Sequence, residues 1–433
     1  MQRVKSALVL CGVVAVGTAW ACSGDDGDRG PAGPAGPAGP AGDAGPEGPP
    51  GTGSPFDGGL SASCMSPCHG FKGVVEQWRS STHYSVFVAN LGGEEVETWT
   101  GPRSCGNCHA MDAIQLRAAG TVGFSGTTGP VNVRNGQLGY FNTASSNRWT
   151  ESIYAGNASV AVVGCTTCHS VSPGTDPHLT GANYTPGSFP LIAPSGATDQ
   201  AYIEKSAAGT ANGTPAGNYG VGNACIWCHK SRKDVTNYIT AANIVSTHWG
   251  PHEGPHADIF TGEGGYEFTG REYRNSSHQA LATGCVECHM PKVADNANIG
   301  DHSFAPRLSS CQRSGCHANA TTFDVGGGVS QMTAGIRDLR RALAERNMLA
   351  REAAPTETIT GDQIGDAFFH EDIPKMPSET PLTANEAGAL YNYLILARGS
   401  AFGIHNPVYS KQLIYDSYFS LKSAGPPSIA VRP

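Results

Sequence analysis

Residues 285–289 read CVECH, and this five-residue phrase sets the pattern around which the chain is organised. Two cysteines, separated by two residues, are followed directly by a histidine. Three further copies keep this spacing and two are stretched by one or two residues: CGNCH (105–109), CTTCH (165–169), CIWCH (225–229), CMSPCH (64–69) and CQRSGCH (311–317). By composition the unstretched form is expected about 0.016 times in this chain, so four copies are not accidental.

This spacing serves the covalent attachment of haem. The two thiols bond to the two vinyl groups of one porphyrin, and the adjacent histidine places its imidazole on the iron as the proximal ligand. The sequence therefore predicts six covalently bound haems of the c type. The attachment cysteines are expected to be Cys64, Cys68, Cys105, Cys108, Cys165, Cys168, Cys225, Cys228, Cys285, Cys288, Cys311 and Cys316. The proximal ligands are expected to be His69, His109, His169, His229, His289 and His317.

Disulfides and zinc are the two other common uses of paired cysteines. A disulfide framework does not require a histidine after every second cysteine, and a zinc site needs four ligands with no reason for this repeated triad. The stretched pairs are weaker signals alone. Of the fourteen cysteines, however, only Cys11 and Cys22 lie outside the six pairs, and both belong to the N-terminal segment.

The first 21 residues predict an export signal. Arg3 and Lys5 precede an apolar stretch, and small residues stand before Cys22. The segment resembles a bacterial lipoprotein signal, in which Cys22 is acylated and anchors the mature chain to a membrane. Cleavage of the same bond by an ordinary signal peptidase would leave Cys22 as a free thiol. We favour the lipid anchor.

Residues 22–58 are dominated by a Gly-x-y repeat, with glycine at every third position from Gly24 to Gly51. This is the period of collagen, but so few triplets make a marginal triple helix. As a single chain, the same proline-rich composition forms an extended spacer. We favour a stalk over a trimer.

The composition of the whole chain is poor in apolar residues and rich in loop formers. Only 39% of the chain is hydrophobic, and it contains 57 glycines and 29 prolines. Such a chain needs cofactors to supply buried apolar area. We therefore expect a multihaem cytochrome c fold for residues 59–320, mostly irregular loop with short α-helices organised around six haems. Glycine-rich inserts at about 119–158 and 181–222 predict loops and short hairpins.

Residues 321–433 carry the clearest helix signals and predict a helical region that packs on the haem domain. Three helices are expected: one with Met332, Ile336, Leu339 and Leu343 on one face, one over residues 385–398, and one capped by Asn406 with Pro407 at its first position and Gly425 as its stop. His405 would then stand at the entrance of the third helix, from which it could reach a haem.

Nine of the fifteen histidines remain for the opposite iron faces, which is enough for six distal ligands. Several stand in phrases that repeat or cluster. WRSSTH ends at His83 and YRNSSH at His278, and STHWGPHEGPHADIF holds three histidines in one loop. Histidines on both faces leave an iron no open site for substrate.

These phrases, together with CVECHMP, DHSF and FGIHNPVY, resemble bacterial multihaem cytochromes, and the whole chain resembles the outer-surface cytochromes of metal-reducing bacteria. The resemblance covers most of the chain from about residue 60. It implies the distal ligands His83, His252, His278, His302 and His405. For the sixth we choose between His178 and His248, with a preference for His248. His256 and His370 are taken as ordinary histidines.

The expected function is extracellular electron transfer through six haems, with other cytochromes or minerals as partners and self-association into filaments as an open alternative. The chain would act as a carrier on the outer membrane surface rather than as an enzyme. A net charge of −8 argues against nucleic acid as a partner. The alternatives are an oxidoreductase resembling nitrite reductase or hydroxylamine oxidoreductase, with one open haem, and a structural or adhesive stalk protein.

Overall fold

A computed structural model describes most of the chain beyond the stalk. The described residues are 68–69, 73–89, 106–118, 122–124, 152–154, 162–181, 187, 189–205, 214–239, 249–293, 296–351, 372–375 and 382–433. The chain divides into two units, Met1–Asp57 and Gly58–Pro433. The predicted signal, Cys22 and the stalk therefore lie outside the described residues, as do Cys64, Cys105, His248 and His370.

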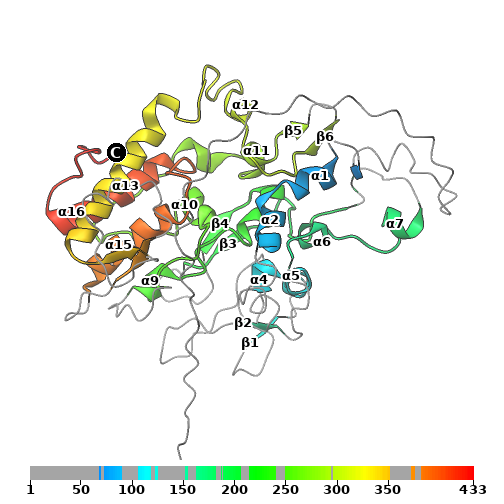
Figure 1. The fold of residues 1–433 in the computed structure, drawn as a ribbon, viewed down its shortest axis with the longest axis horizontal. Helices are drawn as coiled ribbons and strands as arrows, with labels where there is room; N and C mark the ends of the chain where they lie inside the picture. Colours follow the sequence, from blue (N-terminus) through cyan, green and yellow to red (C-terminus); the bar gives the residue numbers. More distant parts are fainter. Residues whose placement is uncertain are drawn as a thin grey trace, which may run out of the picture. The chain divides into compact units, whose positions relative to one another are not determined.

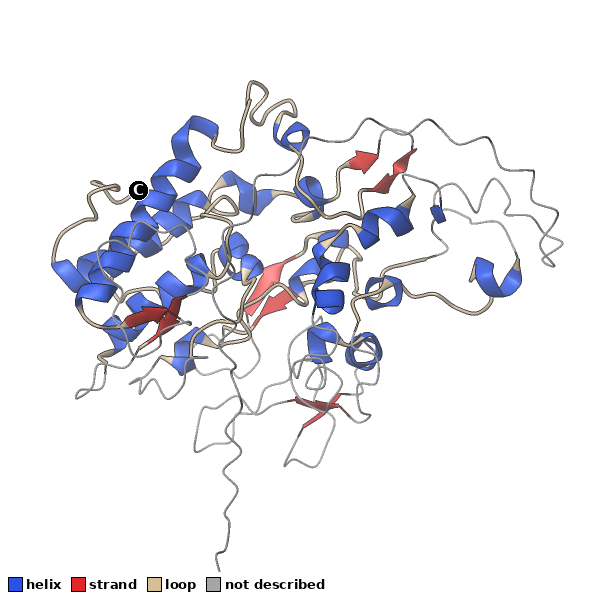
Figure 2. Cartoon of the chain, in the orientation of Figure 1, coloured by secondary structure: helices blue, strands red, loops and turns tan. Residues whose placement is uncertain are grey.

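The described part is built from short helices and isolated two-stranded hairpins (Figure 2). The helices are α1 (Val74–Arg79), α2 (Thr82–Ala89), α4 (Gly106–His109), α5 (Met111–Ala118), α6 (Cys165–Cys168), α7 (Pro177–Thr180), α8 (Asn223–Ile226), α9 (Val235–Tyr238), α10 (His256–Thr261), α11 (Val286–His289), α12 (Leu308–Cys311), α13 (Gly328–Glu345), α15 (Ala384–Ala397) and α16 (Pro407–Lys422). Short 3-10 turns are η3 (Gly220–Gly222), η4 (Ser277–Ala280) and η5 (Val325–Gly327).

Four antiparallel hairpins complete the described elements. They pair β1 (Val122–Phe124) with β2 (Ser152–Tyr154), β3 (Ala201–Ile203) with β4 (Thr214–Gly217), β5 (Lys292–Val293) with β6 (Asn296–Gly300), and β7 (Leu349–Arg351) with β8 (Asp372–Pro374). β3 and β4 pair within the second glycine-rich insert, where short hairpins were predicted, whereas β1 and β2 in the first insert pair across a separation of residues 125–151. No sheet of the described residues exceeds two strands, so these hairpins do not form a layer that could organise a core.

The main apolar core lies between α13, α15 and α16, which pack side by side (Figure 1). Met332, Ile336, Leu339 and Leu343 are all buried on one face of α13, as predicted. The helix expected over residues 385–398 is also confirmed, because α15 covers Ala384–Ala397 behind a capping box between Thr383 and Glu386.

The third predicted helix begins as expected and ends earlier. The Asn406 side chain caps α16 by accepting a hydrogen bond from the Tyr409 N–H, and Pro407 occupies the first position. The helix stops at Lys422, since Ser423 adopts a left-handed conformation (φ 57°) and its N–H bonds to the Phe419 carbonyl. Gly425 is therefore not the stop that the sequence predicted. Its missing side chain instead lets the backbone pass close to the Tyr415 ring.

Across the described residues, no helix is both apolar enough and long enough to pass through a bilayer.

One fully buried ion pair ties the helical region to its hairpin. The Arg340 guanidinium donates two hydrogen bonds of 2.7 Å to the Asp372 carboxylate, and neither side chain is exposed. The Tyr393 hydroxyl donates to the same carboxylate. Removing one partner of such a pair leaves a buried charge uncompensated, which costs far more than losing a surface pair.

We therefore expect Arg340→Met to lower the free energy of unfolding by about 3–5 kcal/mol, measured by denaturant titration of the holoprotein. Arg341→Met is the matched control, because Arg341 neighbours Arg340 on α13 but its side chain is half exposed. That control should change stability by about 0.5 kcal/mol or less. Equal effects of the two variants would contradict a structural role for the buried pair.

Candidate functional site

Each unstretched motif whose first cysteine is described folds into a single tight turn. The backbone N–H of the histidine bonds to the carbonyl of the first cysteine four residues earlier, at 2.9 Å for His169 and 3.0 Å for His229 and His289. This turn places two thiols and one imidazole in the same local arrangement each time. The recurrence follows from the spacing alone, because four residues make one helical turn.

The stretched motif at 311–317 closes in the same way despite its two additional residues. The N–H of His317 bonds to the Cys311 carbonyl at 2.9 Å. Gly315 makes this possible by adopting a left-handed conformation (φ 81°) that L side chains rarely take. The longer spacer thus forms a loop, and the backbone hydrogen bond between the first cysteine and the histidine is the same as in the unstretched motifs. Of the other stretched motif, Cys68 and His69 are described.

Seven described cysteines of the motifs are outside any disulfide: Cys165, Cys168, Cys225, Cys285, Cys288, Cys311 and Cys316. Within the described ranges, no three His, Cys, Asp or Glu side chains gather as a metal-binding cluster. The histidines instead meet in pairs.

Every motif histidine faces a second histidine from another part of the chain. The ring centroids lie 5.8–6.2 Å apart in six pairs: His69 with His178, His109 with His252, His169 with His302, His229 with His83, His289 with His405, and His317 with His278. Most partners lie far apart in sequence, so the folded chain alone brings them together.

This separation suits two imidazoles on opposite faces of one iron. A bond of about 2 Å from each imidazole nitrogen to a metal, with the distance from that nitrogen to its ring centre added, places the two centres about 6 Å apart. Rings stacked directly on one another would be closer. At the four sites where both cysteines are described, the donor set of two cysteine sulfurs and two imidazoles therefore fits an attached haem with histidine on both faces.

The partner of His69 is His178, the alternative that the sequence analysis placed second. His178 lies on α7, where the Asp176 side chain caps the helix and also bonds to the His178 ring nitrogen Nδ1 at 2.9 Å. The centroids of His69 and His178 are 5.8 Å apart. His248, which we had preferred, lies outside the described residues.

Several of the paired histidines have one ring nitrogen tied to an oxygen. The Nδ1 atoms of His169, His252, His278, His289 and His302 lie 2.7–2.8 Å from backbone carbonyl oxygens, and that of His178 lies 2.9 Å from a carboxylate. A metal-binding histidine usually donates its second N–H in this way, which fixes the tautomer and aims Nε2 at the metal. With Nδ1 in a hydrogen bond, the Nε2 atom of each of these rings is the one that could bind a metal.

Burial keeps the central imidazoles neutral. It lowers the pKa of His109, His229 and His252 to about 4 and that of His405 to about 3, with neighbouring histidines adding to the shift at His109, His229 and His405. The pKa of His83 and of His302 is lowered for the same reason. Neutral imidazole is the form that binds metal, so these residues are ready ligands at neutral pH.

The chain has no match among protein-family models, curated proteins or solved structures.

Five of the six pairs, those of the second to sixth motifs, are connected through contacts of their own or neighbouring residues. Phe304 packs its ring against both His83 and His302, which joins the pairs of the third and fourth motifs. The Cys225 thiol donates a hydrogen bond to Cys285, which raises the pKa of Cys225 and joins the fourth and fifth motifs.

Two further bonds extend these connections. The His252 N–H bonds to the Ser231 carbonyl at 3.1 Å, next to the fourth motif, while His252 itself pairs with the second. The Nδ1 atom of His278, the partner of the sixth motif, bonds to the Ile404 carbonyl beside His405. The fourth motif thus lies at the centre of the contacts.

Sequence reasoning missed a buried charge cluster directly behind the fourth motif. Lys230 follows the motif histidine, and its ammonium lies 2.7 Å from the Glu204 carboxylate, with both side chains almost fully buried. Asp258, on α10, accepts a hydrogen bond of 2.8 Å from the Ser231 N–H, and burial raises its pKa to about 7. These groups hold the backbone that follows the motif, and nothing in the sequence pattern marked them.

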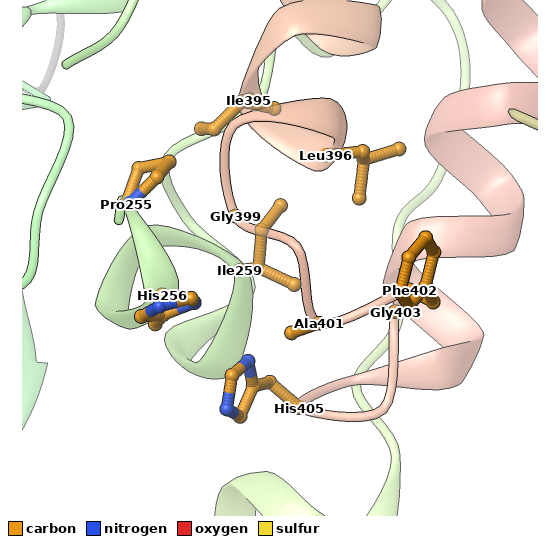
Figure 3. A pocket seen from close by; sticks show the side chains of 10 residues that line it. All are labelled: Pro255, His256, Ile259, Ile395, Leu396, Gly399, Ala401, Phe402, Gly403 and His405. Carbon is orange, nitrogen blue, oxygen red and sulfur yellow. The ribbon is translucent and has the colours of Figure 1, made fainter. Parts of the chain in front are cut away.

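A second feature missed by the sequence analysis is His256, which it took as an ordinary histidine. This residue begins α10 and borders a pocket together with His405, Pro255, Ile259 and the loop that leads to α16 (Figure 3). Its ring stacks on His229 with centroids 5.7 Å apart and lies 4.9 Å from His405.

Proposed function

We propose that this protein is an electron carrier that binds six c-type haems covalently, each between two histidines. The observation that carries the proposal is the set of six histidine pairs, one for each motif, at the spacing expected of axial ligands. The distal ligands in this proposal are His83, His178, His252, His278, His302 and His405.

The residues act on the cofactor in three ways. The cysteines would fix each porphyrin, the motif histidine would hold one iron face, and the distal histidine would hold the other. An attached haem supplies an iron that gains and loses one electron. With both faces held by imidazole, no substrate can reach the iron, which supports a carrier over an oxidoreductase with an open haem.

The contacts between pairs support transfer of electrons through the molecule. Because the third, fourth, fifth and sixth sites adjoin one another at Phe304, at the Cys225 and Cys285 side chains and at the Ile404 backbone, four of the proposed haems would form a continuous series. The second site joins the fourth through His252. An electron that enters one site could therefore leave at another without any long gap.

The location and partners are proposed from the sequence. An export signal, an acylated Cys22 and the Gly-x-y stalk would place the carrier on the outer surface, attached to the outer membrane. There the partners would be minerals or other cytochromes, or further copies of the chain in a filament.

The proposal is tested by the mass and the spectrum of the protein purified from a host that attaches haem. We expect an intact mass that exceeds the processed chain by six haem groups, and a spectrum in which all six are low-spin and unaffected by cyanide or nitrite. One haem that is high-spin and binds these anions would favour the enzyme instead.

The stretched motif is tested separately with the double variant Cys311→Ser and Cys316→Ser. Because the turn from Cys311 to His317 is closed, we expect this site to attach haem and the variant to lose one haem mass of the six. Cys11→Ser, which falls within the predicted signal, is the control and should leave the haem content unchanged. An unchanged mass in the double variant would remove the sixth site.

A further inference from the structure

His256 is a partly buried histidine that the six pairs do not use. Its Nδ1 atom is enclosed and has no hydrogen-bond partner in the described part of the chain. A buried polar atom left in this state costs about 1–3 kcal/mol, so its retention calls for an explanation other than packing. An apolar residue of similar size would fill the same space without that cost.

The neighbours of His256 are themselves histidines of two motifs. The ring stacks on His229 of the fourth motif and lies closer still to His405, the partner of His289 in the fifth. His229 also has a second imidazole beside it, because the centroid of the His229 ring lies 5.8 Å from that of the His83 ring. His256 therefore lies beside the distal position of the fifth site.

Small residues surround the space between the two imidazoles. Gly399, Ala401 and Gly403 line the pocket that His256 and His405 border (Figure 3). His405 ends a loop in which two residues other than glycine are left-handed, Ser400 with φ 49° and Phe402 with φ 44°. Such residues cost about 1–3 kcal/mol each and are common in segments that change conformation.

We propose that His256 is a reserve axial ligand of the fifth haem, which takes the iron when His405 leaves it. The inference rests on the proposed function, because it requires a haem between His289 and His405. One iron–nitrogen bond to a neutral imidazole breaks and another to a neutral imidazole forms. No proton and no electron is transferred.

The test compares holoprotein variants by their spin state. His405→Leu is expected to keep all six haems low-spin, with the spectroscopic signature of one of them changed, since His256 replaces the lost ligand. The double variant His405→Leu, His256→Leu is expected to contain one high-spin haem. The matched control is His405→Leu, His370→Leu, which removes another spare histidine and should behave as His405→Leu alone.

Two outcomes would overturn the inference. One is a high-spin haem already present in His405→Leu, because His256 then fails to bind. The other is six low-spin haems in the double variant, because His405 then holds no iron. A wild-type protein without covalent haem would instead refute the proposed function, and this is read from the intact mass before any variant is compared.

A second measurement leaves His405 in place. Carbon monoxide binds the reduced iron only after a histidine has left it, and a reserve ligand competes for that vacant position. We expect carbon monoxide to bind one haem several-fold faster in His256→Leu than in the wild type. Equal rates in the two proteins would contradict the reserve role even if the His405 variants failed to mature.

Discussion

Replacing His178 by alanine is expected to convert one of the six proposed haems from low-spin to high-spin. The expectation follows from the geometry, because His178 is the histidine whose ring faces His69 and whose Nδ1 is fixed by Asp176. Without it, the iron of the first site would keep His69 on one face and be open on the other. Electron paramagnetic resonance of the oxidised protein measures the change, and cyanide should then bind one haem.

His248→Ala is the matched control for this experiment. His178 and His248 are the two candidates for the sixth distal ligand, so these two variants decide between them directly. Six low-spin haems in the His178 variant, combined with one high-spin haem in the His248 variant, would show that the pairing of His69 with His178 does not describe the holoprotein.

Removing the attachment cysteines of the fourth motif is expected to have the largest effect on folding. Cys225→Ser with Cys228→Ser should prevent maturation of the whole domain rather than cost one haem. The reason is the central place of this motif, whose His229 lies close to His83 and His256 and is followed by the buried Lys230–Glu204 pair. Protein yield, haem content and resistance to protease measure the outcome.

The control is the double variant Cys311→Ser, Cys316→Ser. It removes the attachment cysteines of a motif in which Cys316 and His317 are exposed. It should lose one haem and keep the remainder of the domain resistant to protease. If the fourth-motif variant also retains five haems and a protease-resistant domain, the central site does not organise the fold.

The helical region could be predicted in outline because its signals are local. The apolar face of α13 and the cap of α16 at Asn406 act within one or two turns, and the structure bears both out. The end of α16 was misjudged. A glycine is a common stop, but here Ser423 takes the left-handed position and Gly425 serves close packing against Tyr415.

The turns that hold the motif cysteines and histidines could be predicted from the sequence for a similar reason. The distance between two thiols and a neighbouring imidazole is set by a single turn of backbone, so CxxCH defines a site before the remainder of the chain is known. The same turn is present at His169, His229 and His289, and even the stretched motif closes on Cys311. The haem prediction itself awaits the mass and spectral measurements.

The partner of each motif histidine is decided by the tertiary structure. Residue type and local phrases narrowed the candidates, and the resemblance supplied five of them, but neither could say which histidine meets which. His83 faces His229, and His302 faces His169, because long loops and hairpins bring distant segments together. Such contacts depend on the packing of the entire domain, whereas a motif depends on one turn. The sequence by itself therefore determined which cysteines and histidines share one turn of backbone, and the folded chain decided which imidazoles face each other.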